Sequence, residues 1–191
     1  VHPIISLAKA TQLAKKALSL DDSFPNAYFT LGFVSFARRD YEKAIAFVEK
    51  AIALNPNHSA CYWLLGLILT YSEQPEKGIK CLEKAIRLNP KPQGVYFFVL
   101  GLAYWMLGKN EKAITEYVKA LDQEPNLIFC RAFLIAGYIS AGSKEKAFTA
   151  VEELLKIDPE FSVESFARAR PFKNERDRER LIDALRKAGL K

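Results

Sequence analysis

The sequence has few of the residues on which metal and redox sites depend. Its 191 residues include two histidines, three cysteines and one methionine. Cys61, Cys81 and Cys130 are odd in number, lie far apart and form no CxxC pair, whereas a structural metal site or a redox pair needs clustered ligands. We therefore expect no metal and no cofactor. We interpret the cysteines as small core residues whose free thiols suit the cytoplasm.

The chain also lacks the motifs of an enzyme. It contains no glycine-rich phosphate loop, and neither His2 nor His58 stands at a useful spacing from a carboxylate or a cysteine. The adjacent Glu152 and Glu153 would point along different faces of a helix, so they do not make a catalytic pair. We expect no catalytic residue in this chain, and hence no enzymatic activity of its own.

No apolar run is long enough to cross a membrane. The two most apolar stretches, residues 60–69 and 94–107, are shorter than the ~20 residues that a helical span needs. Residues 1–10 show no cationic region followed by an apolar run and a small-residue cleavage site. We therefore expect a cytoplasmic protein that does not bind membranes.

What the sequence does contain is an internal repeat. Pro56, Pro90, Pro125 and Pro159 close successive segments, and the steps between them are 34, 35 and 34 residues. The segment 25–58 reads as two amphipathic helices joined by a tight turn, and the same plan returns in each later step. A period of this length, filled by a helix pair, predicts a helical solenoid whose units pack on their neighbours.

The repeat resembles the tetratricopeptide repeat (TPR). In that family the first helix carries an aromatic residue, then Leu-Gly, then a large residue, and the second helix carries small and large residues in turn before a proline. The first-helix positions are here Tyr28, Leu31 and Gly32; Tyr62, Leu65, Gly66 and Leu69; and Phe97, Leu100, Gly101 and Tyr104. The second-helix positions are Ala44, Val48, Ala51 and Pro56; Gly78, Leu82, Ala85 and Pro90; and Ala113, Tyr117, Ala120 and Pro125. In the fourth unit Arg131 replaces the aromatic residue and Ile135 the glycine, whereas Leu134, Tyr138, Ala147, Val151 and Pro159 keep the pattern.

The resemblance implies an all-α fold, a right-handed TPR helical solenoid of helix-turn-helix repeats with a C-terminal capping helix. We expect residues 1–22 to hold the second helix of a partial first repeat, residues 23–160 to form four TPR units, and residues 161–191 to form capping helices, all in one continuous domain. Small residues at the repeated positions let helix backbones approach closely. The one extra residue in the array falls within residues 91–95, which predicts a bulged loop before the third unit.

The last residues predict a helix that folds back on the array. Leu181, Ile182 and Leu185 share one face of it, and Gly189 marks its end. Asn174 stands where a helix of this kind begins. We expect this helix to cover the end of the solenoid as a lid.

The resemblance also predicts where a partner binds. In TPR proteins a second stripe of each first helix lines a concave groove. Here that stripe is aromatic and apolar, not rich in Lys and Asn as in the chaperone-binding type, so we expect an apolar or amphipathic segment of a protein or peptide partner. The candidate groove residues are Phe29, Phe33, Phe36, Trp63, Leu67, Tyr71, Phe98, Leu102, Trp105 and Met106. The same side chains could instead be core between successive first helices, and the sequence leaves this alternative open.

Both ends of the chain carry a narrower resemblance. Residues 161–174 and 179–191, together with the opening residues 13–32, are similar to the C-terminal TPR region of bacterial adenylate and guanylate cyclase family proteins. Arg178 stands where that ending has Leu. The resemblance implies a regulatory scaffold within a bacterial signalling protein. No cyclase activity carries over to this chain, because the catalytic domain of those proteins is absent from it.

The net charge of +6 raises an alternative in which the chain accompanies nucleic acid. Residues 168–191 hold nine Lys and Arg against four Asp and Glu, so nearly all of the excess charge lies there. Acidic residues are interleaved with the basic ones and no aromatic residue accompanies the last helix, unlike a surface that stacks bases. We therefore expect a protein partner and no nucleic acid. A self-association module that forms a homo-oligomer stays open as a second alternative.

Overall fold

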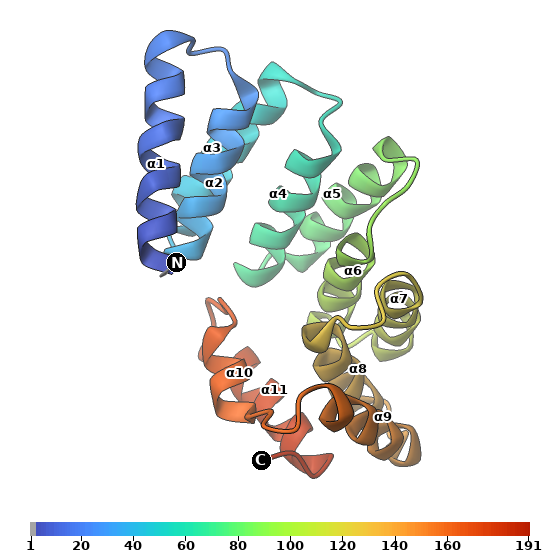
Figure 1. Ribbon diagram of the computed structural model, residues 1–191. Coiled ribbons are helices and arrows are strands. Elements are labelled where there is room, and N and C mark those ends of the chain that lie inside the picture. Colours follow the sequence, from blue (N-terminus) through green and yellow to red (C-terminus); the bar gives the residue numbers. More distant parts are fainter. Residues whose placement is uncertain (1–2) are drawn as a thin grey trace.

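The computed structural model describes residues 3–191, and their side chains from Leu7 onward. These residues form eleven α-helices and no strand (Figure 1). The helices are α1 (Pro3–Leu20), α2 (Pro25–Ala37), α3 (Tyr41–Leu54), α4 (Ser59–Tyr71), α5 (Pro75–Leu88), α6 (Gly94–Met106), α7 (Asn110–Gln123), α8 (Ile128–Ser140), α9 (Lys144–Ile157), α10 (Val163–Ala169) and α11 (Glu175–Lys187). None of the described helices combines the length and the hydrophobicity that a membrane crossing requires.

Helices α2 to α9 pack as four successive pairs. The first helix of each pair (α2, α4, α6 or α8) lies against the second helix that follows it (α3, α5, α7 or α9). Successive pairs are joined by contacts of α3 with α4, α5 with α6, and α7 with α8. Helix α1 packs on α2, in the manner of a second helix without its own partner. The pairs follow one another along an arc (Figure 1). The expected fold class, an all-α solenoid of helix pairs, is confirmed.

Three of the first helices touch their partners at a glycine. A Cβ atom added to Gly32 would lie 2.5 Å from Val48, one on Gly66 2.6 Å from Leu82, and one on Gly101 2.6 Å from Tyr117. The three facing side chains are fully buried, so they have little room to move aside. Glycine is therefore required at these crossings by close packing, which is the reason that the repeat keeps it.

The loop before α6 is one residue longer than its counterparts. Residues 89–93 link α5 to α6, whereas four residues, 55–58 and 124–127, make the equivalent links in the neighbouring units. The Gly94 amide donates a hydrogen bond to the Glu124 side chain at 2.8 Å, and the Trp63 indole N–H donates to the Val95 carbonyl at 3.3 Å. The longer loop is thus held by the units on both sides of it.

The C-terminal residues, α10 and α11, turn back along the inner side of the arc (Figure 1). Helix α11 packs against α8 and α10, and it buries Leu181 and Leu185 completely. The side chain of Asn174 accepts a hydrogen bond from the Arg176 amide at 2.9 Å and so caps the start of α11. Gly189, at φ +94°, follows the helix end. The chain's last helices therefore cover part of the surface that the first helices present.

We expect the substitution Gly101→Ala to destabilise the fold by about 1–3 kcal/mol, the usual cost of overpacking a well-packed core. The added methyl would press on the buried Tyr117 ring and lie 3.1 Å from the Ala113 carbonyl. Gly137→Ala is the matched control, because its added methyl would meet nothing closer than the Ile114 side chain at 3.2 Å. Urea unfolding followed by circular dichroism measures both. Equal stability of the two variants would show that the helix crossing does not depend on glycine.

Candidate functional site: the concave face

The candidate site is the inner face of the arc, which the first helices line. Helix α4 contacts α2 on one side and α6 on the other, and α6 contacts α8. The candidate groove residues stand on α2, α4 and α6 of this row. The structure thus brings them to one continuous surface, but it exposes them unequally.

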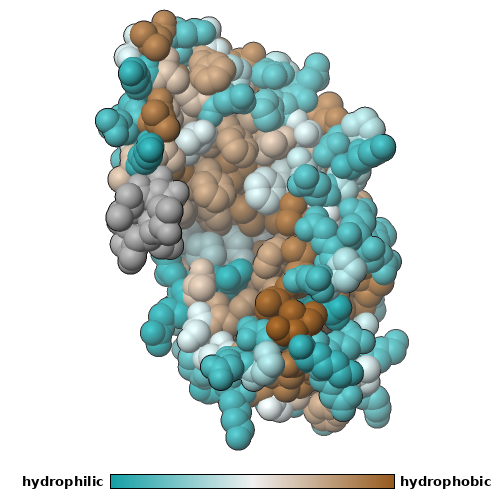
Figure 2. Space-filling model, in the orientation of Figure 1, coloured by the Kyte–Doolittle hydropathy of each residue, from teal (hydrophilic) through white to brown (hydrophobic). Residues whose placement is uncertain are grey.

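The N-terminal part of this face keeps aromatic side chains in contact with solvent. Phe33 is 43% exposed, and Phe29 and Trp63 are half-buried. The Phe29 ring stacks on His58 with 6.1 Å between ring centroids, and Trp63 lies 5.9 Å from the Tyr96 ring. Figure 2 shows a hollow whose walls hold apolar side chains between the N-terminal helices and the tail. We call Phe29, Phe33 and Trp63 the open strip.

The C-terminal part of the face is filled by the chain itself. Phe98, Leu102 and Trp105 are buried, and Met106 is partly buried. The Phe98 ring packs 4.7 Å from Phe129 of α8, so it belongs to the contact between two first helices. An accessible groove is therefore the wrong description for Phe98, Leu102 and Trp105, because neighbouring helices already cover them. These three side chains are instead core between successive first helices, which is the alternative that the sequence left open.

The three remaining candidates stand on α2 and α4, the helices that also carry the open strip. Phe36, Leu67 and Tyr71 are all buried. The Phe36 ring lies 5.8 Å from the Tyr71 ring, and the Tyr71 ring in turn lies 5.1 Å from Phe172, which comes from the tail. Burial raises the pKa of Tyr71 to about 12. These side chains line the concave face, and the tail covers Tyr71 through Phe172.

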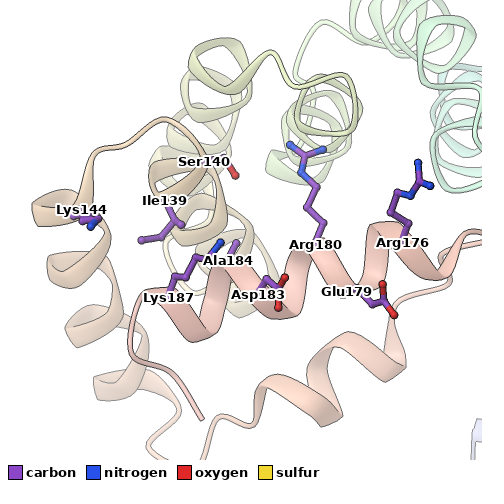
Figure 3. Close-up of a pocket in the computed structure, with 9 residues that line it drawn as sticks. All are labelled: Ile139, Ser140, Lys144, Arg176, Glu179, Arg180, Asp183, Ala184 and Lys187. Carbon is purple, nitrogen blue, oxygen red and sulfur yellow. The ribbon is translucent and has the colours of Figure 1, made fainter.

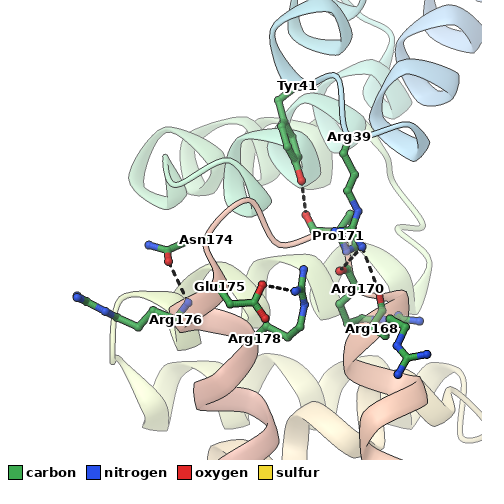
Figure 4. A network of polar contacts seen from close by, with 9 residues as sticks. All are labelled: Arg39, Tyr41, Arg168, Arg170, Pro171, Asn174, Glu175, Arg176 and Arg178. Carbon is green, nitrogen blue, oxygen red and sulfur yellow. Dashed lines mark hydrogen bonds and ion pairs between the residues drawn. The ribbon is translucent and has the colours of Figure 1, made fainter.

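The tail reaches the face through residues 170–174, which we call the tail segment. The Tyr41 hydroxyl donates a hydrogen bond to the Pro171 carbonyl at 2.8 Å (Figure 4). The Lys173 amide donates to the Tyr71 carbonyl at 3.0 Å. Phe172 between them is 2% exposed, with its ring also 6.4 Å from Phe133. Backbone hydrogen bonds on both sides of one buried aromatic side chain hold this segment on the face.

A guanidinium group covers the next aromatic residue along the face. Arg180 of α11 lies 4.1 Å from the centre of the Trp105 ring, a cation–π contact. Partial burial lowers the pKa of Arg180, and the nearby Asp177 opposes that shift. The Trp105 indole N–H donates to the Ser140 hydroxyl at 3.4 Å. Trp105 is thus enclosed by polar as well as apolar contacts.

A charged cavity of about 630 Å³ lies between α11 and the end of α8 (Figure 3). Its lining residues are Ile139, Ser140, Lys144, Arg176, Glu179, Arg180, Asp183, Ala184 and Lys187. Arg176 and Arg180 extend from α11 toward the same side, while Glu179 stands between them along the helix and Asp183 follows Arg180 (Figure 3). Since both signs of charge are interleaved, the cavity carries no strong field of one sign.

Three buried groups, two thiols and one phenol, are held neutral. Burial raises the pKa of Cys61 to about 11 and that of Cys130 to about 12, and it raises the pKa of Tyr117 well above its ordinary value. Thiols in this state are unreactive core groups. Among the described residues, no three His, Cys, Asp or Glu side chains lie close enough together to hold a metal ion.

Two family descriptions match parts of the chain. Residues 5–85 match "Anaphase-promoting complex, cyclosome, subunit 3", and residues 95–127 match "Tetratricopeptide repeat". A search of the curated proteins finds no match. The matched ranges lie within the predicted helix-pair array, on both sides of the longer loop before α6.

Several solved structures share the fold at low sequence identity. MamA (residues 41 to the end) from Desulfovibrio magneticus RS-1 is 22% identical with a TM-score of 0.70, over 81% of this chain and 86% of that one. YrrB, described as a TPR protein with an unusual peptide-binding site, is 21% identical with a TM-score of 0.65, over 92% and 90%. TTC0263, a TPR protein of Thermus thermophilus, is 21% identical with a TM-score of 0.70, over 96% and 94%.

The repeat match, the solved TPR structures and the array of helix pairs together show that this chain has the TPR solenoid fold. At these identities the solved structures establish the fold alone. The narrower resemblance to the TPR region of nucleotide cyclases stays a prediction. The sequence did not point to the tail segment as part of the site, although an aromatic residue after a proline, between two helices, is a signal that could have found it.

We expect Leu185→Ala to destabilise the fold by about 2–5 kcal/mol, the range for truncating a buried leucine. Leu185 is fully buried between α11 and the array, so its loss leaves a cavity. Leu13→Ala is the control, because Leu13 is a leucine that α1 leaves 57% exposed. Thermal unfolding of the two variants gives the comparison. A Leu185→Ala protein that melts with the unsubstituted chain would mean that α11 is a free tail in solution.

Proposed function

We propose that this chain is a protein-interaction scaffold whose open strip holds an apolar or amphipathic segment of a partner, either a peptide or a helix. The observation that carries the proposal is Phe33, an aromatic side chain that is 43% exposed on the concave face beside the half-buried Phe29 and Trp63. Aromatic side chains of this kind dominate the binding energy of protein interfaces. The remainder of the face is already occupied, so the strip marks where a partner can enter.

The solved relatives support a binding role. YrrB is a TPR protein with a peptide-binding site, as its description states. The tail segment supports the same role, because this extended stretch of polypeptide lies on the concave face and is held there by hydrogen bonds to its backbone and by an aromatic anchor. Both observations favour a peptide partner.

The cellular setting belongs to the same proposal. The resemblance of residues 13–32, 161–174 and 179–191 to cyclase-linked TPR regions favours a regulatory module within a cytoplasmic bacterial signalling protein. In such a protein, the strip would receive a segment of a regulator or of another domain.

Charge reversal on the strip tests the proposal. We expect Phe33→Glu to abolish recognition of apolar peptides, since a carboxylate would then have to be buried without a partner. Phe148→Glu is the matched control, because Phe148 is a 50% exposed phenylalanine on α9, a second helix. The measurement is selection from a phage-displayed peptide library, followed by fluorescence anisotropy with the enriched peptides.

The unsubstituted chain and Phe148→Glu should select the same apolar peptides, and Phe33→Glu should bind them at least ~100-fold more weakly, a loss typical of a hot-spot residue. Circular dichroism establishes that all three are folded. Unchanged binding by folded Phe33→Glu would contradict the proposal. Sedimentation of the same proteins addresses the self-association alternative, in which a second copy covers the strip and Phe33→Glu turns a dimer into a monomer.

The nucleic-acid alternative gains little from the arrangement of the tail's charges. Lys173 pairs with Glu42 at 3.3 Å, Arg186 pairs with Glu164 at 2.5 Å, and Arg178 pairs with Glu175. The side chain of Arg180 lies on Trp105. Cations that already have partners are poorly placed to form the row of phosphate contacts on which nucleic-acid affinity depends. We therefore favour a protein partner.

A further inference from the structure

The turns inside the four helix pairs show an irregularity that packing alone does not explain. Each turn places one residue in the left-handed region, at φ 62° for Arg39, 69° for Glu73, 71° for Gly108 and 77° for Gly142. Glycine adopts this conformation without steric cost, whereas residues with a Cβ adopt it at a cost. The last two turns use glycine. The first two use large charged residues at the equivalent position.

The two residues that break the glycine pattern are two that contact the tail. Arg39 Nη2 donates hydrogen bonds to the carbonyl of Arg168 at 3.1 Å and to that of Arg170 at 3.4 Å (Figure 4). Glu73 Oε1 accepts a hydrogen bond from the Asn174 side chain at 2.9 Å. Glycine could make neither contact. The strained turns thus supply side chains that form hydrogen bonds with the tail near each end of the tail segment.

The tail segment is held as a bound peptide would be. Arg170 and Asn174 have extended backbone angles, and Phe172 between them is the one fully enclosed side chain. The side-chain contacts at its ends are exposed, including the pair that Lys173 makes with Glu42. An occupant with one buried anchor and exposed end contacts is open to competition, because exposed polar contacts contribute little net free energy.

We propose that the tail segment is an intramolecular ligand of the concave face, and that the surface formed by Tyr41, Tyr71, Arg39 and Glu73 is a second docking site. Its partner is an extended peptide in which an aromatic residue follows proline and basic residues flank the pair, the chemistry of Arg170-Pro171-Phe172-Lys173. Glu42 provides complementary charge for the basic residue after the aromatic one, and Glu73 accepts a hydrogen bond from Asn174 at the end of the segment. This inference rests on the proposed function and deepens it. It adds a second docking site on the same face, and it makes the tail segment the occupant that limits access to that site.

The arrangement makes binding at this site a competition. A peptide in solution meets a site that the chain's own segment already fills, so its apparent affinity falls by the fraction of molecules whose site is vacant. The partner succeeds only when it binds better than the segment or when the segment is released. Release would uncover Tyr71, which adjoins Phe36 of the concave face.

Removing the internal anchor tests the proposal. The probe is a fluorescent peptide of residues 168–175, blocked at both ends, and the protein is the full chain carrying Phe172→Ala. We expect this variant to bind the probe at least ~10-fold more tightly than the unsubstituted chain, because its site is vacant. Phe148→Ala is the control and should bind as the unsubstituted chain does. A probe in which alanine replaces the phenylalanine should not bind.

The left-handed residues provide the second arm. Adding Arg39→Gly and Glu73→Gly to Phe172→Ala should weaken probe binding several-fold, because both end contacts are lost. A folded Phe172→Ala protein that binds the probe no better than the unsubstituted chain would overturn the proposal. Phe33→Glu should leave probe binding unchanged, so a failure here is distinguishable from a failure of the open strip.

Hydrogen exchange keeps the proposal testable if Phe172→Ala does not fold. In the otherwise unsubstituted chain, Arg39→Gly with Glu73→Gly should speed exchange of the Lys173 amide, which is bonded to the Tyr71 carbonyl, several-fold through local opening. Amides of α2 and α3 should exchange as before, because glycine suits the turns. Unchanged exchange at Lys173 would show that the two side chains do not hold the segment.

Discussion

Each first helix of this protein has two apolar stripes, and a helix pair can bury only one of them by itself. The second stripe must be covered by whatever lies on the inner side of the arc. On α6 the second stripe is covered by the neighbouring first helix, α8, and by α11. At Tyr71 of α4 it is covered by the tail segment. On α2 and α4 it remains partly open, at Phe33 and Trp63. The apolar surface that the concave face leaves open to solvent is therefore set by where this cover ends.

The sequence was sufficient to predict the array, because each repeat position has a local physical reason. Gly32 and Gly101 are where helix backbones meet, and the proline spacing counts the units. The same periodicity placed all of the candidate groove residues on one face. It could not tell Phe33, which is exposed, from Leu102, which is fully buried, since both occupy the same repeat position. Their difference arises from α8 and the tail, whose docking depends on contacts between residues far apart in the sequence.

The tail contacts were beyond sequence reasoning for the same reason. The Tyr41 hydroxyl and the Pro171 carbonyl to which it donates a hydrogen bond are separated by 130 positions in the sequence. The repeat pattern does not include this contact. One local signal existed, however. Arg39 and Glu73 stand where the later turns have glycine, and such a departure from the favoured residue at a left-handed position indicates that the side chain has a role. In this chain that role is contact with the tail, so a defect in the repeat marks a function that the repeat does not explain.

The central claim is that the chain's own tail lies on the concave face in solution. It is tested most directly by nuclear Overhauser contacts in a protein with selectively labelled Phe and Tyr rings. The account predicts cross-peaks from the Phe172 ring to the Tyr71 ring, whose centroids lie 5.1 Å apart, and none between Phe172 and the outward-facing Phe148. Sharp Phe172 signals at random-coil shifts, with no contact to Tyr71, would contradict it.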